Sequence, residues 1–382
     1  MDQHKPSRLQ KLNESKFIII RHANSTFNLI WEKTTDEIQH GNETPEKYYE
    51  IIRDTNLLDC PLSDLGIQQC NDSVRLANAL PDVRTVFVSP LRRALQTAYL
   101  LFKDHENFDR IKFIVHPMLR ENTHTVCDIP ESLDQVKLEY QEKIPHLDFS
   151  LIGSSLQDHQ KKLWYFHDYQ EPVRSLLLNR FANQSDTKNE KEIILEEIVK
   201  TYPGRLEDAQ NTYNRRETFK RFLVEYQRLH GKSAGQICIV GHSQFFSHLT
   251  ATEWPKKQLE EMPEDFRFDH SQHPIKFKWL QNCEFYPIDK YLESLLPLEA
   301  SCSSKSTASS KSSSSVDQNE DMQNQTPNEE DMRREKCKLK HLNSDNGIHS
   351  LRKSSSISNL PQQQQIIQQQ HQHSAPLDDS QE

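Results

Sequence analysis

Four short apolar runs interrupt an otherwise polar sequence, and most of their side chains are aliphatic or β-branched. They span residues 17–21, 83–88, 111–115 and 236–240. The run over 17–20 is short and unbroken, and the other three are mainly apolar, which is typical of strands that are buried on both faces of a sheet. The pattern therefore predicts an α/β protein.

Signals for helices lie between these runs. Pro61 ends the element before it, and Ser63 is a favourable N-cap for a helix over 64–80. Gly66 lies near the start of that helix, where close backbone packing would explain it. Further helices are expected over residues 94–102, 219–229 and 245–252, helix and loop over 29–56, and a last pair of strands over 276–288.

Polar residues follow the strands at their C-terminal ends. Arg21 and His22 lie at the C-terminal end of the first strand, and His242 lies just beyond the fourth. Open α/β sheets bind their ligands at this edge. Arginine binds a phosphate group through two hydrogen bonds, and a neutral imidazole can attack phosphorus, so the pair suits a phosphate site. On its own, however, an Arg-His dipeptide is common by chance.

The other two strands repeat the pattern. The second leads into Ser89–Arg93, a segment with two arginines directly before a helix. Cations at that place oppose the helix dipole, and a bound phosphate would account for them. Glu121 lies just beyond the third strand and is a candidate general acid, although such a carboxylate is more often a surface charge. Asn24 or Ser25 is expected to cap the helix after the first strand.

Composition separates a folded part from a tail. Of the 382 residues, 34% are hydrophobic, and the mean hydropathy is -0.83, which is low for a chain that folds throughout. Residues 301–316 are mostly serine and residues 361–373 mostly glutamine, and such tracts bury too little apolar surface to fold. We expect a mobile leader over 1–15, a catalytic domain over 16–295 with a lid-like insertion over 122–213, and a disordered tail over 296–382.

Charge and cysteine content indicate in which cellular compartment the protein works and which partners it has. A net charge of -9 argues against a nucleic-acid partner. No apolar run approaches the roughly 20 residues of a membrane helix, and the polar N-terminus lacks the apolar core of a secretory signal. The 7 cysteines include no CxxC pair and no metal-ligand spacing. We therefore expect a cytoplasmic protein, with the nucleus as the alternative, and no membrane partner.

Taken together, these motifs resemble those of the histidine phosphatase superfamily, whose fold is also called phosphoglycerate-mutase-like. Residues 21–28 are similar to the RHG loop of the family, residues 61–66 to its PLT..G segment, and residues 89–97 to its SPL.RA.QT helix start. Gly241-His242-Ser243 matches the second histidine of the family.

The resemblance runs from Phe17 to about Phe285. It implies a three-layer sandwich in which helices flank a mostly parallel central sheet. Further likeness at residues 119–121, 127–128 and 148–152 is similar to a eukaryotic branch found in plants and fungi.

Two departures from the family pattern bear on function. Ala23 stands where glycine is usual, and its methyl group is a small intrusion. Residues 123–130 lack the glycine-containing acid loop of the glycolytic mutases, and the mutase motif after the acid is not visible. These differences favour a phosphatase over a glycolytic mutase.

The resemblance implies a phosphohistidine mechanism without a metal or other cofactor. His22 would attack the phosphoryl group, and Glu121 would protonate the leaving oxygen and then activate water, with Asp128 as the backup acid. Of the two neighbouring arginines, Arg93 rather than Arg92 is expected to point inward. The resemblance assigns as catalytic residues His22, Glu121, His242, Arg21 and Arg93, and as phosphate ligands Arg21, Asn28, Arg93 and His242.

Two other functions stay open. One is phosphoryl transfer of the mutase type, which needs a lid that excludes water. The other is a catalytically weak phosphoryl-binding scaffold whose tail recruits protein partners. The full set of site residues favours catalysis on a small phosphomonoester, with a phosphoprotein as the alternative substrate.

Overall fold

The computed structural model describes residues 6–144, 146–152, 163–166, 171–182, 188–202, 204–207, 209–251 and 277–295. The predicted tail over 296–382 lies outside these residues. So do residues 1–5 of the predicted leader and several parts of the predicted insertion.

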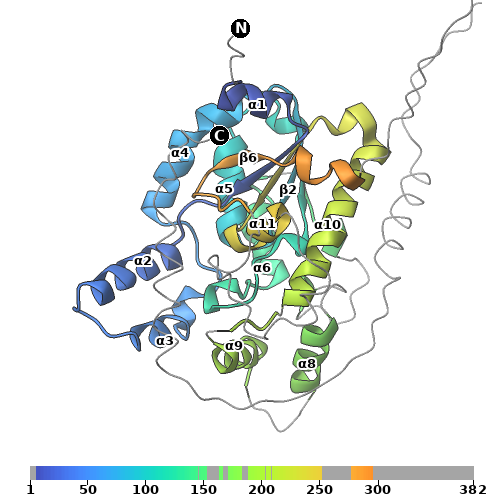
Figure 1. Cartoon of the computed structure of the whole chain (residues 1–382). Coiled ribbons are helices and arrows are strands. Elements are labelled where there is room, and N and C mark those ends of the chain that lie inside the picture. Colours follow the sequence, from blue (N-terminus) through green and yellow to red (C-terminus); the bar gives the residue numbers. More distant parts are fainter. Residues whose placement is uncertain are drawn as a thin grey trace, which may run out of the picture.

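A six-stranded sheet forms the centre of the molecule (Figure 1). Its order is β4-β3-β2-β5-β1-β6. The strands are β1 (Phe17–Arg21), β2 (Val83–Val88), β3 (Lys112–Val115), β4 (Leu147–Asp148), β5 (Gln236–Gly241) and β6 (Phe285–Pro287). All neighbours pair in parallel except β1 and β6, which are antiparallel. The predicted mostly parallel sheet is confirmed, and each of the four apolar runs forms a strand.

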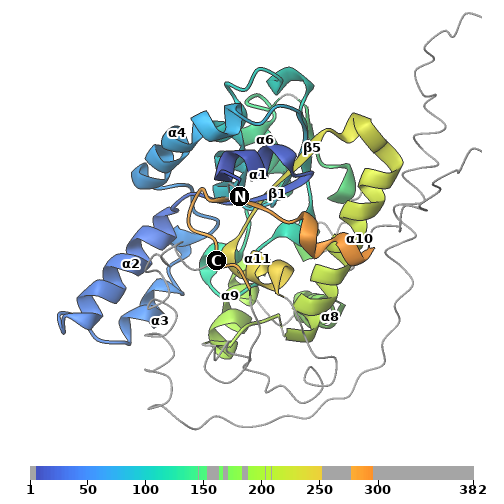
Figure 2. The same cartoon turned by 45° about the horizontal axis from the view of Figure 1, so that its top comes forward.

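Helices cover both faces of this sheet, which confirms the three-layer sandwich (Figures 1 and 2). On one face, α4 (Asp64–Asn78) and α5 (Arg92–Phe102) share a core with Ile18 and Ile20. On the other face, α10 (Ala209–His230) and α11 (Ser243–Thr250) share a core with Phe17 and Ile19. Successive side chains of a strand point to opposite faces, so an uninterrupted apolar run serves both cores.

Helix α4 begins where the sequence signals place it. Ser63 is its N-cap and accepts a hydrogen bond from the backbone N–H of Gly66 at 3.1 Å. Gly66 packs against the loop that follows β1, and a Cβ atom at this position would lie 2.0 Å from the carbonyl oxygen of Asn24. The glycine therefore allows α4 to approach the residues next to His22.

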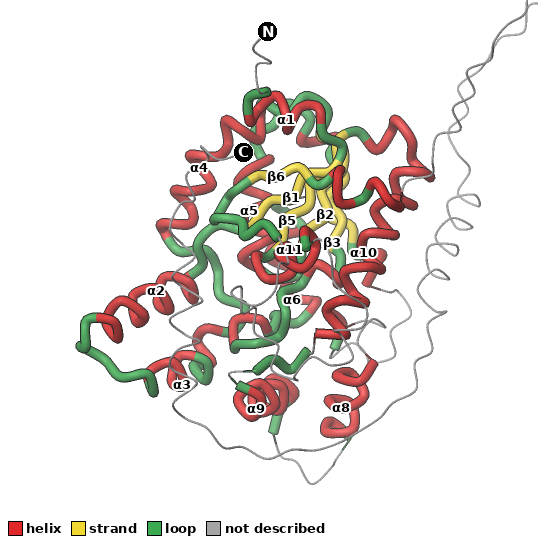
Figure 3. The backbone as a smooth tube through the Cα atoms, in the orientation of Figure 1, coloured by secondary structure: helices red, strands yellow, loops and turns green. Residues whose placement is uncertain are grey.

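Five further helices gather at one end of the sheet (Figure 3). They are α2 (Thr26–Gln39), α3 (Lys47–Ile51), α6 (Leu133–Tyr140), α8 (Glu171–Phe181) and α9 (Glu190–Thr201). Trp31 of α2 and Tyr48 of α3 share an apolar cluster with Val126 and Tyr202. The segment over 29–56 thus packs against the segment over 122–213. The latter segment also contributes β4 to the sheet, so part of it belongs to the central layer rather than to a lid.

The N-terminal segment differs from the expected mobile leader. Residues 8–14 form helix α1 (Arg8–Glu14), and Leu12 is fully buried. Gln236 Nε2, at the start of β5, donates hydrogen bonds to the carbonyl oxygens of Leu12 and Ser15, at 3.0 Å each. The helix is anchored by a residue that is distant in the sequence, which a local pattern does not reveal.

The expected last pair of strands is a single strand. Within 277–288, only β6 is extended and paired. The residues before it form a loop that serves the end of β1. Leu280 O accepts a hydrogen bond from Arg21 Nη1 at 2.9 Å, and Cys283 N donates to Arg21 O at 3.1 Å. This loop therefore bonds to Arg21 at single points and does not pair with β1 as a second strand would.

Candidate active site

Three strand ends bring two histidines and a serine together. The strands β2, β5 and β1 are neighbours in the sheet and run in parallel, so their C-terminal ends meet at one edge. Ser89, His242 and His22 are the residues that follow these strands. The ring centroids of His22 and His242 are 4.9 Å apart.

One ring nitrogen of His22 is hydrogen-bonded to the backbone, and the other faces the site. His22 Nδ1 lies 2.7 Å from the carbonyl oxygen of Ala23, which can only accept, so Nδ1 carries the proton. His22 Nε2 then bears the lone pair and accepts a hydrogen bond from Arg93 Nε at 3.3 Å. Burial, followed by the charges of Arg93 and Arg21, lowers the pKa of His22 well below its usual value. The neutral imidazole is therefore the stable form.

His242 is fully buried and is positioned by Ser89. His242 Nε2 lies 2.7 Å from Ser89 Oγ, and this oxygen also accepts a hydrogen bond from Leu91 N at 3.3 Å. Within the described part of the chain, His242 Nδ1 has no hydrogen-bond partner. Leaving a buried polar atom unsatisfied is costly, and an oxygen of a bound anion would satisfy it. Burial, then Arg93 and His22, lowers the pKa of His242 well below its usual value.

Arg93 is the inward-facing arginine of α5. Besides His22, its guanidinium donates to Cys127 O at 2.6 Å and to Asp128 Oδ1 at 2.8 Å, and both charged side chains are buried. Arg92 turns toward Glu139, with Nε and Oε2 2.9 Å apart. Both arginines therefore have carboxylate partners in the protein itself, in addition to any phosphate.

Asp59 explains why α5 starts at Arg92, two residues before the predicted start. The helix N-cap, Leu91, has no side chain that can cap. Asp59 Oδ1 accepts from Arg92 N at 2.8 Å, and its Oδ2 accepts from Glu131 N at 2.9 Å. Burial raises the pKa of Asp59 to about 7. Sequence reasoning missed this residue because it lies far from α5 in the chain.

The guanidinium of Arg21 has a donor that makes no hydrogen bond within the described residues. Its Nη1 donates to Leu280 O, whereas its buried Nε has no hydrogen-bond partner among the described residues. Burial lowers the pKa of Arg21 to about 10, against the opposing charge of Glu121. Arg21 is therefore still a cation at neutral pH, and it lies next to His22.

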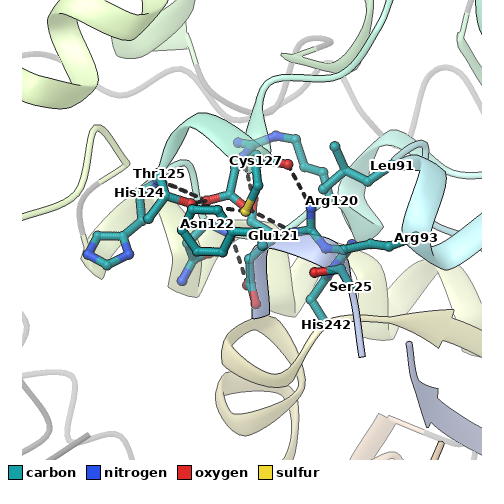
Figure 4. Close-up of polar contacts among 12 residues, drawn as sticks. Ser25, Leu91, Arg93, Arg120, Glu121, Asn122, His124, Thr125, Cys127 and His242 are labelled. Atoms are coloured by element: carbon teal, nitrogen blue, oxygen red, sulfur yellow. Dashed lines mark hydrogen bonds and ion pairs between the residues drawn. The ribbon is translucent and has the colours of Figure 1, made fainter. Parts of the chain in front are cut away.

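Glu121 lies at the N-terminus of α11 (Figure 4). Its carboxylate accepts hydrogen bonds from Gln244 N and Phe245 N, at 3.1 Å each, and from Asn122 N at 2.9 Å. The side chain is 8% exposed. Burial, followed by the charge of Asp128, raises the pKa of Glu121. A raised pKa favours the protonated carboxyl group, which is the form that a general acid needs.

A buried charged network, missed by sequence reasoning, holds the backbone around Glu121. Glu207 lies between two arginines: its Oε2 accepts from Arg120 Nη2 at 3.0 Å and its Oε1 from Arg215 Nε at 2.8 Å. Arg215 Nη1 also donates to Arg120 O at 2.6 Å, and Arg120 Nη1 donates to Glu121 O at 2.8 Å. The network therefore holds the backbone carbonyl groups of Arg120 and Glu121 in place.

Asn28 and Asp128 have structural partners. Ser25 is the N-cap of α2 and forms a capping box with Asn28, whose Oδ1 accepts from Ser25 N at 3.2 Å. Asp128 accepts from Thr125 N at 3.0 Å in addition to Arg93. The Nδ2 of Asn28 is not used by the capping box.

No group of three or more His, Cys, Asp or Glu side chains in the described part of the chain is arranged to hold a metal ion. No helix within the described residues is long and apolar enough to cross a membrane.

A neutral buried histidine with an available lone pair, flanked by guanidinium groups at the carboxyl edge of an α/β sheet, fits phosphoryl hydrolysis or transfer. A sequence model described as the histidine phosphatase superfamily (branch 1) matches residues 38–166. The match covers about a third of the chain, and over these residues the chain is similar to the histidine phosphatase superfamily.

Two solved structures of phosphatases are similar to the chain. The chain is similar to the phosphoserine phosphatase of Entamoeba histolytica in complex with 3-phosphoglyceric acid, with 15% identity, coverage of 70% of this chain and 87% of that chain, and a TM-score of 0.25. It is also similar to the ecdysone phosphate phosphatase of Bombyx mori in complex with tungstate, with 12% identity, 70% and 86% coverage, and a TM-score of 0.33. No curated protein matches the chain significantly.

Proposed function

We propose that the chain is a metal-independent phosphatase that hydrolyses phosphomonoesters through a phosphohistidine at His22. One observation carries the proposal. The bond from His22 Nδ1 to Ala23 O leaves an unprotonated Nε2 beside Arg93. An imidazole nitrogen in this state can attack phosphorus without first losing a proton.

In the first step, His22 Nε2 forms a bond to phosphorus, and the bond from phosphorus to the ester oxygen breaks. Glu121 donates its proton to that oxygen, so that a neutral alcohol leaves. The raised pKa of Glu121 supports this role, because the carboxyl group must still hold its proton when the substrate binds.

In the second step, water attacks phosphorus. The Glu121 carboxylate accepts a proton from that water, the N–P bond breaks, and its electron pair returns to Nε2. Phosphate leaves, and both groups regain their starting protonation states. Splitting one difficult displacement into two is the advantage of the covalent intermediate.

Charge on the phosphoryl oxygens would be stabilised by protein groups alone. Arg21 and Arg93 are cations beside His22, and the unpartnered atoms Arg21 Nε and His242 Nδ1 have hydrogen-bonding capacity left over. Preorganised donors of this kind, in a site shielded from water, are an effective source of transition-state stabilisation. Asn28 is proposed as a further donor through its Nδ2.

The test is hydrolysis of an aryl phosphate with and without EDTA. We expect turnover that resists EDTA, and a loss of at least about a thousandfold in His22→Ala. His40→Ala, which removes an exposed histidine at the end of α2, is the matched control and keeps wild-type turnover. Radiolabelled phosphate should also be trapped on the wild-type chain after denaturation, and not on His22→Ala.

EDTA-sensitive turnover, or turnover that survives His22→Ala, would contradict the proposal. An enzyme that forms the phosphohistidine but returns the phosphoryl group to a second hydroxyl is a mutase, which a product analysis distinguishes. The cytoplasmic or nuclear setting and the protein partners of the tail stay predictions.

A further inference from the structure

Asp59 begins a short segment that runs beside the chain just after His22. Leu62 of this segment forms an antiparallel bridge with Ser25. Asp59 itself is fully buried, and its backbone φ angle is 38°, in the left-handed region that residues other than glycine adopt at a cost. Such a conformation persists only where the surrounding contacts hold it, and it is most frequent at functional sites.

The two carboxylate oxygens of Asp59 bind two different segments. Oδ1 accepts a hydrogen bond from Arg92 N at 2.8 Å, and Oδ2 accepts one from Glu131 N at 2.9 Å. Arg92 is the first residue of α5, and Glu131 follows the loop that contains Asp128. An ionised carboxylate accepts at both oxygens, and its negative charge is favourable at the N-terminus of a helix. The ionised form of Asp59 therefore fits both bonds.

Both of these segments hold Arg93. One supplies its backbone, because Arg93 is the second residue of α5. The other supplies acceptors for its guanidinium, which donates to Cys127 O at 2.6 Å and to Asp128 Oδ1 at 2.8 Å. The same guanidinium donates to His22 Nε2 at 3.3 Å. Asp59 thus connects the backbone of this arginine with the loop that orients its guanidinium, beside the proposed nucleophile.

We propose that Asp59 is a positioning residue, whose ionised carboxylate keeps the guanidinium of Arg93 in place beside His22. It does so by joining the start of α5 to the loop that binds this guanidinium. The inference rests on the proposed function, in which Arg93 stabilises charge on the phosphoryl oxygens. A displacement of about 1 Å in a group of this kind can lower the rate about a hundredfold, so loss of the two bonds to Asp59 is expected to affect turnover.

The charge of Asp59 changes near neutral pH. Burial raises its pKa to about 7, against the two backbone hydrogen bonds and the charges of Arg93 and Arg92. Burial also raises the pKa values of the neighbouring thiol and phenol groups, which therefore stay neutral at this pH: Cys60, Tyr140 and Tyr165. Of these groups, only Asp59 changes its charge near pH 7, so the link is complete at higher pH and weakened at lower pH.

Asp59→Asn keeps the shape of the side chain, removes its charge and replaces one acceptor oxygen with a donor. With a pKa of about 7, Asp59 is about 90% ionised at pH 8 and about 10% ionised at pH 6. We expect the variant to lose at least about tenfold in kcat/KM for an aryl phosphate at pH 8, and much less at pH 6, where wild type has lost most of the link as well. Asp54→Asn, which alters a carboxylate that accepts from Asn56 N at 3.0 Å, is the matched control and keeps wild-type values.

A loss in Asp59→Asn that is equal at the two pH values, or no loss at either, would overturn the positioning role. NMR of wild type tests the same link without turnover and without the variant. The side-chain carboxyl carbon of Asp59, the backbone amides of Arg92 and Glu131, and the Nε–H signal of Arg93 should shift together, with one midpoint at about pH 7. An Arg93 signal that does not follow Asp59 would overturn the inference. If wild type turns over no phosphomonoester but these signals titrate together, the proposed function fails and the link stands.

Discussion

Hydrogen bonds to single ring nitrogens decide what the two histidines can do. His22 Nδ1 is bonded to the carbonyl oxygen of Ala23, so Nε2 carries the lone pair that faces the site. In His242 the two nitrogens have the opposite roles. Nε2 is hydrogen-bonded to Ser89, and Nδ1 has no partner among the described residues and is available to a ligand. Because a neutral imidazole has one donor and one acceptor, each of these bonds orients the ring and biases its tautomer.

Ser89→Ala removes the bond that orients His242. We expect kcat for an aryl phosphate to fall about 10- to 100-fold with a smaller change in KM, because the ring loses its hold on the transition state. Thr85→Val is the matched control, since it removes a buried hydroxyl from the opposite end of β2. If the two variants lower kcat equally, Ser89 affects turnover only through the stability of the fold. Urea unfolding of both variants measures that stability.

At the scale of elements, the site depends on how closely α4 approaches the loop after β1. The carbonyl oxygen of Asn24 accepts from Ser63 N at 3.0 Å, and Gly66 leaves room for this contact. The loop carrying His22 is held on the other side by Asn282 Nδ2, which donates to His22 O at 2.8 Å. The position of His22 is thus set by two segments that are far apart in the sequence.

Gly66→Ala forces a methyl group against the Asn24 backbone. We expect a loss of about 1–3 kcal/mol or more in the free energy of unfolding, even though alanine is the better helix former. Asp72→Ala, on the exposed face of α4, should change stability by less than about 0.5 kcal/mol. Urea denaturation of both variants checks the difference, and a Gly66→Ala chain as stable as wild type would mean that α4 can shift.

At the scale of the whole molecule, burial of several ionisable groups makes stability depend on pH. His22, His242 and His248 all have pKa values well below the usual one, with burial as the largest cause. The unfolded chain takes up these protons below about pH 6.5, and the folded chain does not, so stability falls as the pH falls. Asp59 works in the opposite direction, because its pKa is raised to about 7.

His248→Gln isolates one of these contributions. The stability that wild type loses between pH 7.5 and pH 5.5 should be smaller in the variant by about 1 kcal/mol, because one proton-linked group is gone while Asp59 is unchanged. Urea unfolding of both chains at the two pH values measures this difference. An identical loss in the two chains would show that His248 is protonated in the folded protein.

Most of the architecture was readable from local patterns. The apolar runs located the four central strands, and Ser63 located the start of α4, because burial on both faces and helix capping depend on neighbouring residues. Helix α1 and the single strand β6 were not readable, because Gln236 and Arg21 define them through distant contacts.

The same division holds for the candidate site. The residue types and their places after the strands, at His22, Arg93, Glu121 and His242, follow from the sequence alone, because parallel strands present their ends at one edge. The tautomer of His22 and the capping of α5 by Asp59 required the folded chain. Each of them depends on hydrogen bonds or charges that only tertiary packing brings within a few ångströms.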